Sequence, residues 1–165
     1  QKPLSSAATI YLVIKYYHDL ALQEEIAVCH ACSTALKQGY SAESQQTLKN
    51  VFNEAHLQRR LDILFATEDL ASRCERMLSH CSVCGIPREQ VTEFFEYALC
   101  EGDEIVFYTQ PSFVCVPCTL RIYDSLSAQT KEYKHRFFER HFGFPPPGSE
   151  KVSLIGPNPW WLLAG

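Results

Sequence analysis

The stretch "HCSVCG", residues 80–85, decides the fold, because it places two cysteines three positions apart beside a histidine. The same spacing recurs in "CHAC" at residues 29–32 and in "CVPC" at residues 115–118. Both sulfurs of a C-x-x-C turn can reach one metal ion, and they supply half of a tetrahedral site with Zn–S bonds of roughly 2.3 Å. Two such pairs close one structural site.

The second and third pairs form the predicted site. Thirty residues separate Cys84 from Cys115, a distance typical of four-thiolate zinc sites. We therefore predict that Cys81, Cys84, Cys115 and Cys118 bind one Zn²⁺. Disulfides or redox-active cysteines are the alternative, although secreted disulfide scaffolds are usually shorter and rich in loops. A unit this small would draw folding free energy directly from the metal.

Composition narrows the class of function. The 165 residues are 46% hydrophobic and carry a net charge of -4, so no chain-wide positive field holds phosphates, and nucleic acid is not an expected partner. No apolar run is long enough for a membrane span, and the start lacks a signal-peptide pattern. Because the chain opens at Gln1 rather than Met, we expect a processed or trimmed form.

The segments around the cysteines predict small elements of both kinds. Residues 87–100 begin with a proline and carry apolar residues on one face, which indicates a short helix. Residues 101–109 combine a turn with β-branched and aromatic residues, which indicates a small hairpin leading into the last pair. Residues 119–142 are expected to be helical. The predicted fold class is α+β, with small zinc-stabilised modules and short β-hairpins joined by amphipathic helices.

An internal repeat appears when the chain is shifted by 86 residues. The shift aligns Val28, Cys29, Cys32, Ser41, Ala42 and Phe52 with Val114, Cys115, Cys118, Ser127, Ala128 and Phe138. The repeat predicts four segments: a partial or degenerate first zinc-module-like unit over 1–52, a helical linker over 53–79, a zinc module with its following helix over 80–143, and a proline-rich tail over 144–165. The opening pair of the first unit would fall just upstream of Gln1.

Cys29 and Cys32 therefore predict an incomplete second metal site, so that one zinc is expected and two are the alternative. Four residues are candidates to complete it: His18, His30, His56 and Cys74. Each also has an ordinary interpretation, since a lone histidine is commonly solvated or hydrogen-bonded. Cys74 lies at helical spacing from Leu70 and Leu78, which is typical of a small core residue.

The stretch "RCERMLSHCSVCG" at 73–85 and the chain that follows it resemble the papillomavirus E-six oncoprotein family. That family repeats a zinc module in which a helix and a small sheet lie between two C-x-x-C pairs, and another helix follows. The likeness covers about residues 70–133 well and residues 28–52 weakly. The tandem arrangement of the modules is also similar.

The resemblance implies a viral adaptor without enzymatic activity, acting in the nucleus and cytoplasm of a host cell. Members hold an acidic LxxLL helix of a host protein between two zinc modules and the connecting helix, and so redirect ubiquitin or signalling pathways. The adjacent Arg59 and Arg60 are candidates for the basic rim of an acidic-peptide groove, and a solvated charged face is their ordinary interpretation. His80 stands where the family often has an arginine facing the peptide.

Other functions remain as alternatives. A zinc enzyme needs an open coordination position, and four thiolates leave none; a cysteine–histidine nucleophile pair stays open. The main alternative is a zinc-dependent dimerisation or interaction domain of a transcription-associated regulatory protein, with a second copy of the chain as partner. The apolar tip at Trp160 and Trp161 is expected to pack back on the body.

Overall fold

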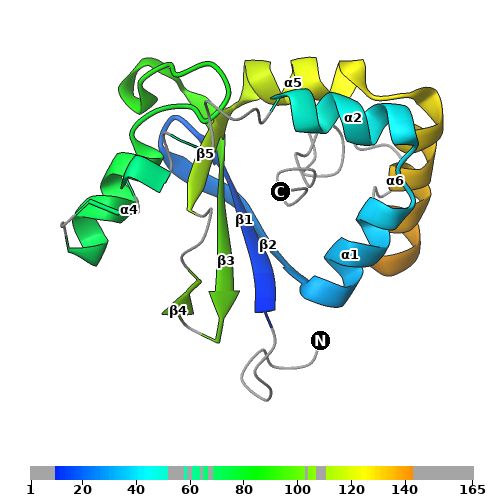
Figure 1. Ribbon diagram of the computed structural model, residues 1–165, viewed down its shortest axis with the longest axis horizontal. Helices are drawn as coiled ribbons and strands as arrows, with labels where there is room; N and C mark the ends of the chain where they lie inside the picture. Colours follow the sequence, from blue (N-terminus) through cyan, green and yellow to red (C-terminus); the bar gives the residue numbers. More distant parts are fainter. Residues whose placement is uncertain are drawn as a thin grey trace.

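The computed structural model describes residues 10–51, 58, 61–63, 65–66, 69–102, 104–106 and 111–142. Its strands are β1 (Ile10–His18), β2 (Ala21–Cys29), β3 (Glu93–Glu101), β4 (Glu104–Ile105) and β5 (Ser112–Cys115). Its helices are α1 (His30–Gln38), α2 (Ala42–Val51), α4 (Leu70–Leu78), α5 (Val116–Ser125) and α6 (Ala128–Phe142), with a 3₁₀ turn, η2, at Arg88–Gln90. The predicted α+β class is confirmed (Figure 1).

One antiparallel sheet joins strands from the first and the second half of the chain. Its order is β2-β1-β3, and both β4 and β5 pair with β3. The helices α1, α2, α5 and α6 lie on one side of this sheet and α4 lies on the other (Figure 1). The sheet therefore lies between the main core and a second, smaller apolar layer under α4.

The expected helix over 87–100 is wrong beyond its first turn. Pro87 precedes a single 3₁₀ turn, and the chain then forms the nine-residue strand β3. Both faces of β3 are covered, since Phe94 and Phe95 are each almost fully buried although they point to opposite sides. A strand buried on both faces loses the alternation that identifies strands, so its apolar run imitates a helix face.

The hairpin of β1 and β2 was not predicted at all. Its first strand, "IYLVIKYYH", is rich in β-branched and aromatic residues, which favour strands. The turn lies at Asp19 and Leu20, which both have positive φ (48° and 63°). Two positive φ values match the twist of a two-residue hairpin. Leucine seldom occupies this conformation. The turn therefore lacks the Asn-Gly or Asp-Gly pair by which such hairpins are usually predicted.

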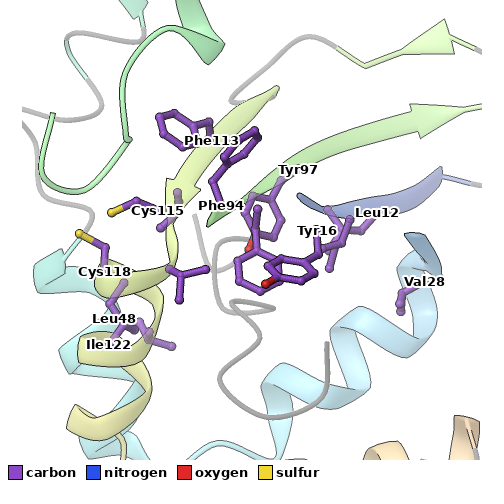
Figure 2. Close-up of a cluster of buried hydrophobic side chains, with 14 of the residues drawn as sticks. Leu12, Tyr16, Val28, Leu48, Phe94, Tyr97, Phe113, Cys115, Cys118 and Ile122 are labelled. Atoms are coloured by element: carbon purple, nitrogen blue, oxygen red, sulfur yellow. The ribbon is translucent and has the colours of Figure 1, made fainter. Parts of the chain in front are cut away.

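Side chains of alternate residues divide the core. On the helix side, Leu12, Ile14 and Tyr16 of β1 pack with Tyr97 of β3, and the hydrophobic cluster continues into the helices (Figure 2). Figure 2 also shows Leu48 of α2 beside Ile122 of α5, where these two helices are in contact. The core is therefore built jointly by the early and the late segments.

The strand pairs β1–β2 and β3–β5 are copies of one unit. Tyr11 lies opposite Cys29 in the first pair, and Phe94 lies opposite Cys115 in the second. Each cysteine is then the N-cap of a helix, α1 or α5. Strand β1 thus corresponds to residues 83 positions later in β3, whereas the helices keep the 86-residue shift. Three extra residues between β3 and β5 account for the difference.

The copies face each other with two-fold symmetry along β1 and β3. Tyr11 lies opposite Cys100, which is the counterpart of Tyr17. Tyr17 lies opposite Phe94, which is the counterpart of Tyr11. Reciprocal contacts of this kind define an isologous two-fold interface, as in a homodimer. The chain therefore contains, within itself, the interface that two such units would form.

The helices repeat this reciprocity through hydroxyl groups. The oxygens of Ser41 and Ser127, which are 86 residues apart, lie 2.8 Å from each other. The backbone N–H of Ser41 donates to Oγ1 of Thr130, and the N–H of Ser127 donates to Oγ of Ser44, both at 3.0 Å. Ser44 and Thr130 are counterparts as well, and both are fully buried. These side chains therefore join the N-termini of α2 and α6.

A close contact between α1 and α6 depends on Gly39. A β-carbon at this position would overlap the ring of Tyr133. The Tyr133 hydroxyl donates to the carbonyl oxygen of Ala35 at 3.1 Å. Glycine is therefore required here by the lack of space rather than by its backbone conformation.

We predict that the serine and threonine contacts stabilise the pairing of the two units. Ser44→Ala removes the acceptor for the N–H of Ser127 and leaves a half-buried donor unpaired, which costs roughly 1 kcal/mol. Thr130→Val should cost a similar amount at the equivalent position. Urea unfolding measures both, with exposed Ser125→Ala as a control that changes stability by less than about 0.5 kcal/mol. Equal stability of all three variants would contradict the reciprocal arrangement.

Candidate metal centre

The sulfur atoms of Cys81, Cys84, Cys115 and Cys118 all lie within 4.8 Å of one another. Zn–S bonds of about 2.3 Å in a tetrahedron place neighbouring sulfurs roughly 3.8 Å apart. The measured separation of the Cys84 and Cys115 sulfurs is 3.8 Å. The spacing of the pairs thus predicted which cysteines meet, and the resulting cluster could hold one metal ion.

The first pair lies on a tight loop after α4. The N–H of Cys81 donates to the carbonyl of Ile86 at 2.8 Å, and the N–H of Gly85 donates back to the carbonyl of Cys81 at 2.9 Å. Gly85 has a φ of 73°, the left-handed conformation that glycine adopts without strain. The N–H of Ser82 donates to the carbonyl of Phe113 at 2.8 Å. The loop is therefore fixed to strand β5 by its backbone.

The second pair lies where β5 becomes α5. Cys115 ends the strand and is the N-cap of the helix, and Pro117 occupies the first turn, where a missing N–H costs nothing. Cys118 lies in the same turn, close to the positive end of the helix dipole, which favours thiolates. Figure 2 shows the two sulfurs at the edge of the core, pointing to the same side.

Crowding of the sulfurs separates their pKa values. Hydrogen bonds with Cys115 and Cys118 hold the pKa of the Cys81 thiol far below its usual range. Hydrogen bonds with Cys115 and Cys81, together with burial, raise the pKa of Cys118. A divalent cation would resolve this conflict, because thiolates are the metal-binding form and the cation offsets their charges. Four cysteine sulfurs are a donor set that structural Zn²⁺ sites use.

The disulfide alternative is not what the structure contains. All eight cysteines are free, and 3.8 Å between the Cys84 and Cys115 sulfurs is far longer than a disulfide bond of about 2.05 Å. Three of the four sulfurs belong to residues that are almost fully buried, whereas Cys84 is exposed. The cluster is therefore accessible to solvent mainly from the Cys84 side.

Cys29 and Cys32 hold the positions in the first unit that Cys115 and Cys118 hold in the second. The Cys29 sulfur accepts the N–H of Cys32 at 3.4 Å, at the start of α1. Among the described residues, no third sulfur, imidazole or carboxylate forms a metal-binding group with them. A second metal site at Cys29 and Cys32 therefore stays a prediction, for which the described residues supply two ligands.

Of the candidates to complete that site, His18 and Cys74 lie away from Cys29 and Cys32. His18 is seven residues from Tyr11, the strand partner of Cys29, which corresponds to roughly 23 Å along β1. His18 is instead bound to Glu93, with Nδ1 and Oε1 2.9 Å apart. Cys74 is on α4, across the sheet. His30 is adjacent to Cys29 and exposed, and His56 lies outside the described residues.

Of the three predicted partner-binding residues, the structure describes only His80. His80 is exposed, and its Nδ1 lies 2.8 Å from the hydroxyl of Ser79. Arg59 and Arg60 lie outside the described residues, as do residues 144–165 with the tail at Trp160 and Trp161. Their predicted roles stay predictions.

Sequence analysis missed a groove between α4 and the sheet. It contains a cavity of about 160 Å³. The lining residues are Val13 and Lys15 of β1, Glu96, Tyr97 and Ala98 of β3, Cys74 and Leu78 of α4, and Ile105 and Pro111. Only the helical spacing of Cys74 and Leu78 points to this face, and the same spacing is typical of core residues. Within the predicted helical linker over 53–79, the structure has α4 at Leu70–Leu78.

Arg121 was also missed. Its Nη2 atom donates to the sulfur of Cys118 at 3.3 Å. Its position three residues after Cys118 could have indicated this contact, since residues three apart share a helix face. The C-x-x-C pattern, however, identifies only the ligands.

Comparisons with protein-family models, with curated proteins and with solved structures find no match. In the part of the chain that the structure describes, no helix has the length and apolar character needed to cross a membrane.

We predict that metal binding depends on the four clustered cysteines and not on the remaining ones. Cys115→Ser should abolish the tight site and unfold β5 and α5, because the metal contributes folding free energy directly. Cys100→Ser, at a half-buried thiol outside the cluster, is the matched control. Metal content per chain and circular dichroism, with and without chelator, provide the readout. Equal metal content in the two variants would exclude this centre.

Proposed function

We propose that this protein is a non-enzymatic adaptor of the E-six type, in which one Zn²⁺ at the four-cysteine centre shapes a groove for a leucine-bearing acidic helix of a host protein. The observation that carries the proposal is the apolar groove under α4, directly before the metal loop in the chain. Bound partners would then be redirected to ubiquitin or signalling pathways.

The groove has the size for a leucine. Its cavity measures about 160 Å³, and an apolar cavity of about 150 Å³ in another protein binds benzene. Val13 and Ala98, which lie opposite each other on β1 and β3, supply an apolar floor. One isobutyl side chain from a partner helix fits this space. A helix laid in a groove places its leucines on one face for such pockets.

An apolar stripe on α4 continues the groove to solvent. Leu70, Cys74 and Leu78 are four residues apart and therefore share one face of the helix. Leu70 is 57% exposed, which is unusual for a leucine on the apolar face of a helix. Ile105, which lines the cavity, is 39% exposed. A partner helix would cover both side chains.

The charges beside the stripe favour an acidic partner. Helix α4 carries Arg73 and Arg76 against Glu75, and the carboxylate of Asp69, its N-cap, is engaged by the N–H groups of Ala71 and Ser72. On the groove floor, Lys15 pairs with Glu25 at 3.3 Å, while Glu96 is neutralised by Arg88 at 2.8 Å. The basic side chains of α4 would meet acidic residues that flank the leucines of the partner, which adds specificity more than affinity.

The internal two-fold arrangement argues against an obligate homodimer. A dimerisation module offers its two-fold interface to a second chain, but here β1 is already paired with β3 and Ser41 with Ser127 within one chain. The adaptor proposal therefore predicts a monomer. The dimerisation domain remains the alternative, and sedimentation or light scattering of the zinc-loaded protein distinguishes the two.

We predict that a short fluorescent acidic LxxLL peptide binds the zinc-loaded chain with micromolar affinity. Leu70→Gln should weaken binding by roughly tenfold, or about 1.4 kcal/mol, because it removes apolar contact at the end of the groove without adding charge. Fluorescence polarisation measures both constants.

Leu120→Gln is the matched control. Leu120 is also an exposed leucine, 42% accessible, but it lies on α5. Its variant should bind the peptide like the wild type. No binding by folded, zinc-loaded protein, or equal weakening by the two variants, would refute the groove as the docking site.

A further inference from the structure

We propose that Arg121 is a positioning residue that retains the metal, by donating a charge-assisted hydrogen bond to the Cys118 thiolate. This inference rests on the proposed zinc site. It concerns the lifetime of the bound metal, a property that the four ligands do not determine by themselves.

The first step is electrostatic. Four thiolates around Zn²⁺ leave a net charge of about −2 on a largely buried cluster, and buried charge is costly unless it is paired. The guanidinium group of Arg121 reaches the Cys118 sulfur at 3.3 Å. Hydrogen bonds to charged groups are about twice as strong as neutral ones. Arg121 thus compensates part of the charge at its source.

The second step is the position of the arginine on α5. Cys118 and Arg121 are one turn apart, on the same face of the helix. Arg121 is exposed and also borders an open hollow of about 390 Å³ between α2 and α5, whose lining includes Val83 of the metal loop. The guanidinium group therefore lies between the buried sulfur and the solvent in this hollow.

The third step is a comparison within the chain. The counterpart of Arg121 in the first unit is Ala35, 86 residues earlier. Helix α1 forms with alanine at this position, which is exposed. The architecture of the repeated unit therefore does not require an arginine here. Its presence coincides with the unit in which four sulfurs converge.

The experiment measures the rate at which zinc leaves the folded protein. A chromogenic zinc acceptor is added in such excess that the rate no longer depends on its concentration. Arg121→Gln should release zinc roughly tenfold faster, the lower end of the effect expected for residues that support metal ligands. Arg121→Lys should fall in between, because lysine keeps the charge but lacks the planar fork.

The control is Arg136→Gln, which removes the same charge from α6, where Arg136 is exposed and pairs only loosely with Glu132 at 3.5 Å. It should release zinc at the wild-type rate. A second readout is the thiolate-to-metal charge-transfer spectrum of the cobalt-substituted protein. That spectrum should shift in Arg121→Gln and not in Arg136→Gln, while the far-ultraviolet circular dichroism of the zinc-loaded forms stays the same.

Two outcomes overturn the proposal: Arg121→Gln releases zinc at the wild-type rate, or Arg136→Gln accelerates release as much, which would reduce the effect to net charge. Both outcomes differ from failure of the zinc site itself, in which the wild-type protein binds no zinc to release.

Discussion

The convergence of four sulfur atoms is the constraint on which the second half of the molecule depends. One pair follows directly after α4 and the other lies at the junction of β5 and α5. A metal ion at this point would fix the loop that follows α4 to the junction of β5 and α5. The position of α4 over the groove would therefore depend on this centre.

The internal two-fold arrangement explains how a chain of this size builds a core without a partner. Each unit alone is two strands and two helices, and its apolar sheet face is covered only when the other unit is present. The two units differ in chemistry. The second holds the closed cluster with Arg121, and the first holds Cys29, Cys32 and Ala35 at the corresponding positions. Even the buried Leu48 corresponds to a lysine, Lys134, whose pKa is lowered by burial and whose Nζ lies 5.0 Å from the ring of Tyr123.

Sequence reasoning found what depends on local spacing. The ligand set follows from C-x-x-C chemistry, and the 86-residue repeat follows from matched residues such as Ser41 and Ser127, which the structure brings into contact. It failed where tertiary context prevails. Strand β3 is apolar on both faces because α4 and the helical layer cover it from two sides, and no single segment reveals that double burial. The groove is formed by the same packing of α4 on the sheet, so it could not be predicted from the sequence without knowledge of the sheet.

The most direct test of the account is X-ray absorption at the zinc edge, on purified Cys29→Ser/Cys32→Ser double variant, in which only the complete cluster remains. The account predicts one zinc ion per chain with four sulfur neighbours at about 2.3 Å. Nitrogen or oxygen atoms in the coordination shell, or protein that carries no zinc and has its cluster cysteines oxidised to disulfides, would contradict it.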